Sequence, residues 1–135
     1  MTESFDKNLL MAIAQQTIVP FVGAGVSLGV NKSESQKKFL TWTQLLQVLV
    51  KELQEIDKKG AKRVQSTIED GDLLDAANIA LKKLGKAAFA DAVVGAVSVA
   101  KQDCDLTLPQ AIWGLNPRLI VTTNYDRVLQ WGGED

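Results

Sequence analysis

Apolar positions along the chain follow two periodicities, one typical of buried strands and one typical of helices. Residues 18–22 and 118–122 form short runs of mostly apolar, partly β-branched residues, as in strands of a parallel sheet that are buried on both faces. Between about 41 and 101 the apolar residues recur at helical spacing and no clear strand is found. We therefore expect a helix-rich α/β fold, a partial Rossmann-like parallel sheet with a helical insertion at about 41–101.

Local start and stop signals predict where the helices lie. Thr41 and Gln44 form a capping box that begins a helix with an apolar stripe reaching Ile56, and Gly60 follows its expected end. Asp72 is a suitable N-cap for a further helix that Gly85 stops. Other helices are expected at 4–16, 61–70, 87–101, 109–113 and 127–131, with a polar loop at 31–38.

Composition narrows the class of protein. A length of 135 residues with 46% apolar and 23% charged residues suits one soluble domain. The net charge of −1 gives no electrostatic footprint for nucleic acid. The most apolar stretch, 87–100, is too short to span a bilayer and carries Asp91. We expect a cytoplasmic protein that binds neither membrane nor nucleic acid.

Cysteine and histidine usage excludes several chemistries. Cys104 is the single cysteine, so no internal disulfide can form, which fits a reducing cytoplasm. The chain has no histidine. A Ser-His-Asp triad, a Cys-His dyad and a histidine-ligated metal are therefore excluded within these residues, and no metal is expected.

A glycine-rich loop follows the first expected strand. Gly23-Ala24-Gly25 precedes Ser27, and glycines give the backbone dihedrals closed to other residues and leave room for a ligand. A helix that starts here would direct its N–H groups at a phosphate. The dinucleotide fingerprint is incomplete, because Leu28 takes the place of the third glycine, and no Walker lysine is present. An ordinary glycine turn after a buried strand is the alternative.

The second expected strand also ends in polar residues, at 123–126. The carboxyl ends of parallel strands share one edge of a sheet, so Asn124 and Asp126 would face the glycine loop. An amide and a carboxylate suit ribose hydroxyls and a carboxamide. Alternatively, both residues cap the helix that follows, since Asn and Asp are favoured caps.

Four aromatic residues are expected to pack rather than to bind a ligand. Trp42 stands at the start of a helix, where a binding role is the alternative to packing on the core. Trp113, Tyr125 and Trp131 are likewise expected to be packing residues.

In order along the chain, these motifs resemble the sirtuin family. Residues 23–27 are similar to its GAGxS loop, and residues 119–126 to its strand that ends in an asparagine and an aspartate separated by one residue. Thr41-Trp42-x-x-Leu45-Leu46 and Leu74-x-Ala76-Ala77 complete the pattern. It is most similar to the bacterial sirtuin-like domains at the front of anti-phage defence proteins, several of which cleave NAD.

The resemblance implies an NAD site and a reaction. It implies that Asn124 lies beside the nicotinamide ribose and helps to organise the attacking water or acceptor, and that Asp126 meets the nicotinamide carboxamide. These two would be the catalytic residues, and nicotinamide would leave through an oxocarbenium-like transition state. The implied cofactor-binding residues are Gly23, Ala24, Gly25, Ser27 and Thr123.

The departures from the family pattern qualify that expectation. The family's catalytic histidine is missing, and one cysteine cannot build the zinc ribbon of the deacetylases. Two strands make an inadequate sheet. We expect the NAD-binding part of an NAD hydrolase that is inactive by itself, either the N-terminal portion of a longer chain or a truncated relative. Its exposed strand edges would promote a homo-oligomer. The alternative is a non-catalytic sirtuin-like binding or assembly module.

Overall fold

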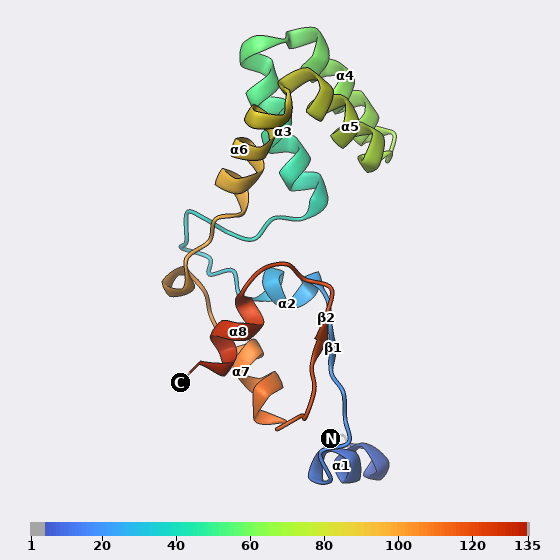
Figure 1. Ribbon diagram of the computed structural model, residues 1–135, viewed down its shortest axis with the longest axis vertical. Coiled ribbons are helices and arrows are strands. Elements are labelled where there is room, and N and C mark those ends of the chain that lie inside the picture. Colours follow the sequence, from blue (N-terminus) through green and yellow to red (C-terminus); the bar gives the residue numbers. More distant parts are fainter. Residues whose placement is uncertain (1–4, 135) are drawn as a thin grey trace. The chain divides into compact units, whose positions relative to one another are not determined.

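The structure is a computed structural model that describes residues 5–134 (Figure 1). The chain divides into two compact units, and each is described by itself. The sheet unit combines the residues up to 35 with those from 100 onward, and the helical unit spans 36–99. The stretch expected as a helical insertion at about 41–101 thus corresponds to a unit whose bounds are 36 and 99.

The sheet unit contains two short parallel strands. β1 (Phe21–Val22) pairs with β2 (Val121–Thr122), with Phe21 opposite Val121 and Val22 opposite Thr122. This confirms a helix-rich α/β fold with parallel strands. Both strands are shorter than the expected 18–22 and 118–122. Pro20 explains the late start of β1, because proline has no N–H to donate to a strand ladder.

Helices flank the strands in the sequence of the sheet unit. In chain order they are α1 (Lys7–Ala14), α2 (Ala24–Gly29), the 3₁₀ turn η1 (Lys101–Asp103), α7 (Thr107–Gly114) and α8 (Val128–Gly133). α7 and α8 correspond to the helices expected at 109–113 and 127–131. The expected start of the first helix at residue 4 lies outside the described residues. Asp6 begins α1 at Lys7, since its carboxylate accepts the N–H groups of Asn8 and Leu9.

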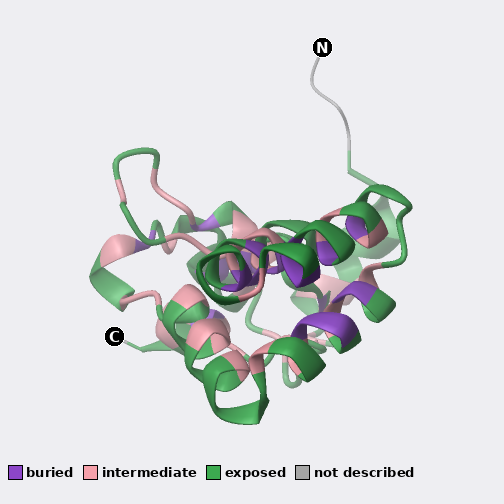
Figure 2. Ribbon diagram, turned by 90° about the horizontal axis from the view of Figure 1, so that it is seen from above, coloured by how far each residue is buried: buried purple, intermediate pink, exposed green. Residues whose placement is uncertain are grey.

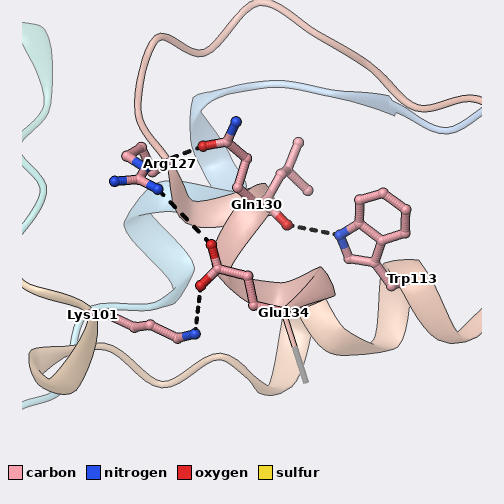
Figure 3. Close-up of polar contacts among 6 residues, drawn as sticks. Lys101, Trp113, Arg127, Gln130 and Glu134 are labelled. Carbon is pink, nitrogen blue, oxygen red and sulfur yellow. Dashed lines mark hydrogen bonds and ion pairs between the residues drawn. The ribbon is translucent and has the colours of Figure 1, made fainter.

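α8 is fixed against α7 and η1 by polar contacts that Figure 3 shows. The indole N–H of Trp113 donates to the carbonyl of Leu129 at 2.7 Å. Glu134 accepts from Lys101 at 2.8 Å and lies 3.9 Å from Arg127. The Lys101 hydrogen bond, followed by the charges of Lys101 and Arg127, lowers the pKa of Glu134. These contacts hold the helix that begins directly after the polar end of β2.

The helical unit is built from α3 (Trp42–Ile56), α4 (Lys58–Glu69), α5 (Leu73–Leu84) and α6 (Lys86–Val97). Buried residues gather along one face each of α3, α4 and α5, and Figure 2 shows buried residues in purple. The core residues with the lowest exposure are Leu46, Leu49, Leu53, Ala61, Val64, Ala76 and Ala80. Across residues 5–134, no helix combines the length and apolar character needed to cross a membrane.

The predicted caps of the helical unit are confirmed. Thr41 and Gln44 form both bonds of the capping box, at 3.2 and 2.8 Å. The Asp72 carboxylate accepts the N–H of Asp75 at the start of α5. Gly85 ends α5 with φ of +81°, a left-handed backbone conformation that favours glycine.

The prediction for Gly60 is wrong. Gly60 lies inside α4 rather than after a helix end, because Asp57 starts a new helix immediately after α3 and accepts the N–H of Gly60 at 2.8 Å. The helix expected at 61–70 therefore begins at Lys58. A Cβ at Gly60 would lie 2.6 Å from Oδ2 of Asp57, so glycine lets the capping carboxylate come close.

Several apolar residues are more exposed than expected. Trp42 is 53% exposed, so its expected packing on the core is wrong. It precedes Leu46, the first buried residue of α3, by one turn and lies beyond the end of the core. The helix expected at 87–101 ends at Val97 and has no buried residue, although Phe89 packs against the core.

Candidate functional site

The ends of β1 and β2 are joined by hydrogen bonds at their shared carboxyl edge. The hydroxyl of Thr122 donates to the carbonyl of Val22 at 2.9 Å and accepts the main-chain N–H of Asn124 at 3.0 Å. The main-chain N–H of Thr123 also donates to Val22, at 3.3 Å. The parallel pairing therefore places the glycine loop and residues 122–126 next to each other, as the sequence predicted.

Asn124 connects the two strand ends through its side-chain amide. Its Nδ2 group donates to the carbonyl of Gly23 and to Oγ of Ser27, both at 3.0 Å. Both amide hydrogens are thereby used, whereas Oδ1 makes no hydrogen bond within residues 5–134. Asn124 thus offers a ligand an acceptor and no donor.

Asp126 is bound at both carboxylate oxygens. Oδ2 accepts the hydroxyl of Ser27 at 2.6 Å, the length typical of a charge-assisted O–H···O⁻ bond. Oδ1 accepts the main-chain N–H of Val128 at the start of α8, at 3.0 Å. The helix-capping alternative therefore describes Asp126 in part, and it does not describe Asn124, whose amide is turned to the glycine loop.

Ser27 forms hydrogen bonds with both Asn124 and Asp126. It is 5% exposed, and its hydroxyl donates to Asp126 while it accepts from Asn124. Four expected site residues, Gly23, Ser27, Asn124 and Asp126, are in this way brought together by hydrogen bonds. Thr123 is exposed at the strand end, and its side chain lies outside the network.

Gly23 and Gly25 were expected to adopt backbone dihedrals closed to other residues, and this expectation is wrong. Gly23 has φ of −109° and ψ of −171°, extended backbone that any residue adopts, and Gly25 lies within α2 without a positive φ. A Cβ built at either glycine meets no atom within 4 Å. Neither the backbone nor internal packing requires glycine here, and the main chain at both positions faces open space.

The start of α2 leaves main-chain donors beside that space. α2 begins at Ala24, as the predicted helix start requires. The N–H groups of Ala24 and Gly25 have no acceptor within the described part of the chain, because the first N–H groups of a helix lack an intrahelical partner. These donors, the Oδ1 atom of Asn124 and the exposed hydroxyl of Thr123 are unused polar atoms of the site.

Two side chains of this region differ from the sequence-based interpretation. Tyr125 is 104% exposed, so its expected packing is wrong. It stands between Asn124 and Asp126, which both turn toward the glycine loop and leave its ring in solvent. Thr122 was missed, although a threonine two residues before a strand-end asparagine is the pattern of a side-chain-to-backbone turn.

No group of three or more acidic, cysteine or histidine side chains suited to a metal is found among residues 5–134. Comparison of the chain with models of known protein families, with curated proteins and with solved structures found no match.

Proposed function

We propose that the sheet unit binds NAD at the carboxyl edge of β1 and β2, as the NAD-binding part of a sirtuin-like NAD hydrolase. The observation that carries this proposal is the open space at Gly23 and Gly25, which is bordered by the Asn124–Ser27–Asp126 network. The two strands then belong to a Rossmann-like sheet, in which ligands bind outside the carboxyl ends of the strands.

Recognition of the pyrophosphate falls to the glycine loop. The unused N–H groups of Ala24 and Gly25 are donors at the start of α2, and backbone donors at a helix start favour anionic oxygens. The missing Cβ atoms allow a phosphate to approach the main chain closely. Ser27 is buried and supports this loop through Asn124 and Asp126, rather than facing solvent.

Recognition of the nicotinamide ribose falls to Asn124. Its Oδ1 atom is the unused acceptor of the network, and ribose hydroxyls and water are donors. Cleavage of the nicotinamide–ribose bond develops positive charge on the sugar, which a nearby carboxylate and an oriented amide oxygen stabilise. Asp126, held by Ser27 and Val128, supplies that carboxylate.

The chain by itself is not expected to cleave NAD. The chain contains no histidine, so the base that the family uses is not supplied by these residues. We propose binding of NAD without appreciable release of nicotinamide. The setting, bacterial anti-phage defence in the cytoplasm, rests on the motif resemblance only.

One observation favours a second candidate, a non-catalytic sirtuin-like binding or assembly module. Both carboxylate oxygens of Asp126 accept hydrogen bonds within the chain, and these bonds connect α2 to the start of α8. In that role Asp126 fixes the fold and has no direct contact with a ligand.

Two measurements on the 135-residue chain test these proposals. Calorimetric titration with NAD is expected to give saturable binding, and chromatography of an overnight incubation is expected to show no nicotinamide above the protein-free control. Absence of NAD binding contradicts the proposed function and leaves the assembly module. Nicotinamide release well above the control contradicts the expectation that a histidine base is needed.

A further inference from the structure

Charged residues of the helical unit are segregated along α4 and α5. The start of α4 and the end of α5 carry basic side chains, and the turn between the two helices carries acidic ones. The basic end consists of Lys58, Lys59, Lys62, Arg63, Lys82, Lys83 and Lys86, all exposed, and it outweighs the two acidic residues beside it, Glu55 and Asp57. The acidic turn consists of Glu69, Asp70, Asp72 and Asp75, also exposed, and residues 64–81 contain no Lys or Arg.

An ion pair shows that the basic side chains meet at one end of the unit. Asp57, the N-cap of α4, lies 3.0 Å from Lys83 in the last turn of α5. The first turn of α4 is thereby placed beside the last turn of α5. Lys83 is the one basic side chain of this end that forms an ion pair within residues 5–134. The other six have no ion-pair partner there.

This arrangement opposes the stability of α4. Lys58 and Lys59 lie at its N-terminus and Glu69 at its C-terminus, where the helix dipole disfavours those charges. α5 has the favourable order, with Asp75 in its first turn and Lys82 and Lys83 in its last. Pairing the two helices therefore brings like charges together at each end, and the apolar contacts of Ala61, Val64 and Ile68 with the core hold α4 in place against this repulsion.

We propose that the helical unit associates head to tail with a second copy of this chain, the basic end of one copy against the acidic turn of the next. The two patches lie at opposite ends of α4, whose 12 residues span about 18 Å. Lys58 and Glu69 are thus separated by more than the Debye length of about 10 Å at 0.1 M salt, whereas Arg63 and Glu69 lie about 9 Å apart along the helix, so the patches neutralise each other only in part within one chain. A second copy supplies the complementary charge to one of the two patches, and a further copy can supply it to the other.

A second copy explains both patches, whereas a polyanion explains only one. Nucleic acid would be attracted by the basic end and repelled by the acidic turn. A head-to-tail contact is heterologous, so it leaves one patch free at each end of the pair and can extend to further copies.

Two charge-reversal variants of the 135-residue chain test the proposal. The first combines Lys58→Glu, Lys59→Glu, Lys62→Glu and Arg63→Glu, and the second combines Glu69→Lys, Asp70→Lys and Asp75→Lys, which spares the cap Asp72. Sedimentation velocity at about 0.05 M salt is expected to show association of the unchanged chain, which disappears at about 0.5 M salt because ions screen the contact. Each variant alone is expected to be monomeric at low salt.

Sedimentation of a mixture of the two variants tests most directly whether the basic end of one copy contacts the acidic turn of another. The former basic end of the first variant keeps Lys82, Lys83 and Lys86 beside the new glutamates and no longer attracts an acidic turn, whereas the turn of the second variant becomes basic. The intact acidic turn of the first variant can still pair with the intact basic end of the second, so an equimolar mixture is expected to associate although neither variant does so alone. Thermal melting controls for folding, since the first variant places glutamates at the start of α4 and is expected to melt at or above the temperature of the unchanged chain.

Four results would overturn the proposal. The first is an unchanged chain that is monomeric at low salt, and the second is association that survives high salt or persists in either variant. The third is a mixture of the two variants that stays monomeric. The fourth is a chain that binds a short DNA duplex at its basic end without associating. Association that persists in both variants would instead assign the contact to exposed apolar surface.

Discussion

Replacement of Gly25 by alanine separates stability from ligand binding at the glycine loop. Gly25 lies inside α2, has no positive φ, and a Cβ there meets no atom within 4 Å. Alanine is therefore expected to stabilise the fold by about 0.5–1 kcal/mol, the difference in helix propensity. For 135 residues this corresponds to a rise in melting temperature of about 2–4 °C.

NAD binding is expected to change in the opposite direction. The added methyl group occupies the space through which a phosphate reaches the N–H groups of Ala24 and Gly25, and loss of one hydrogen bond to a charged group costs about 1.5–3 kcal/mol. The dissociation constant for NAD should rise by about 10- to 150-fold, measured by calorimetric titration.

Gly95→Ala is the matched control for this variant. Gly95 also lies inside a helix, α6, with no positive φ and no atom within 4 Å of an added Cβ. It should give a similar stabilisation with unchanged NAD affinity. If Gly25→Ala also binds NAD as tightly as the unchanged chain, the glycine loop does not contact the ligand and the reasoning fails.

Three further predictions concern stability. Asn124→Asp replaces an amide that donates two hydrogen bonds, one of them to Ser27, and should destabilise the fold by about 1–3 kcal/mol in thermal melting, whereas a helix cap would tolerate the change. Gly60→Ala brings a Cβ to 2.6 Å from the Asp57 carboxylate and displaces this cap, which should cancel the helix-propensity gain of about 0.5–1 kcal/mol in denaturant unfolding, with a stabilisation as large as that of Gly95→Ala contradicting the close approach. The N–H of Gly60, then Lys83, lowers the pKa of Asp57 from its ordinary value of 3.8, so its contribution to stability is present above that value and is lost as the pH falls through the lower folded pKa. The difference in melting temperature between the chain and Asp57→Ala should therefore narrow as the pH falls below about 4, and a constant difference down to pH 2 would refute this.

Local signals in the sequence were sufficient for most helices. Thr41 with Gln44, Asp72 and Gly85 act within a few residues of their own position, so their roles could be read directly from the sequence. Asp57 was missed because α4 follows α3 without a loop, and the apolar stripe then offers no gap that marks a new helix.

The strands and the site depended on contacts between distant parts of the chain. The parallel pairing of residues near 21 and 121 follows from the shared character of two apolar runs, but their length is set by Pro20 and by the few residues that pair. The network of Ser27, Asn124 and Asp126 joins positions about 100 apart, so sequence order could suggest their proximity and could not assign donors and acceptors.

The surroundings of Gly23 and Gly25 could not be predicted from the sequence either. From the sequence, Gly23 and Gly25 suggested unusual dihedrals, whereas the backbone there is ordinary and the surroundings are open. Open space in front of a loop depends on where other side chains lie, and no local pattern encodes it.

The most direct test of the NAD site is a titration of the isotopically labelled chain with NAD, followed by amide chemical shifts. Saturable shifts concentrated at residues 23–27 and 122–126, with residues of the helical unit unchanged, are the expected result. Absence of saturable shifts, or shifts confined to residues outside these two segments, would contradict an NAD site at the carboxyl edge of β1 and β2.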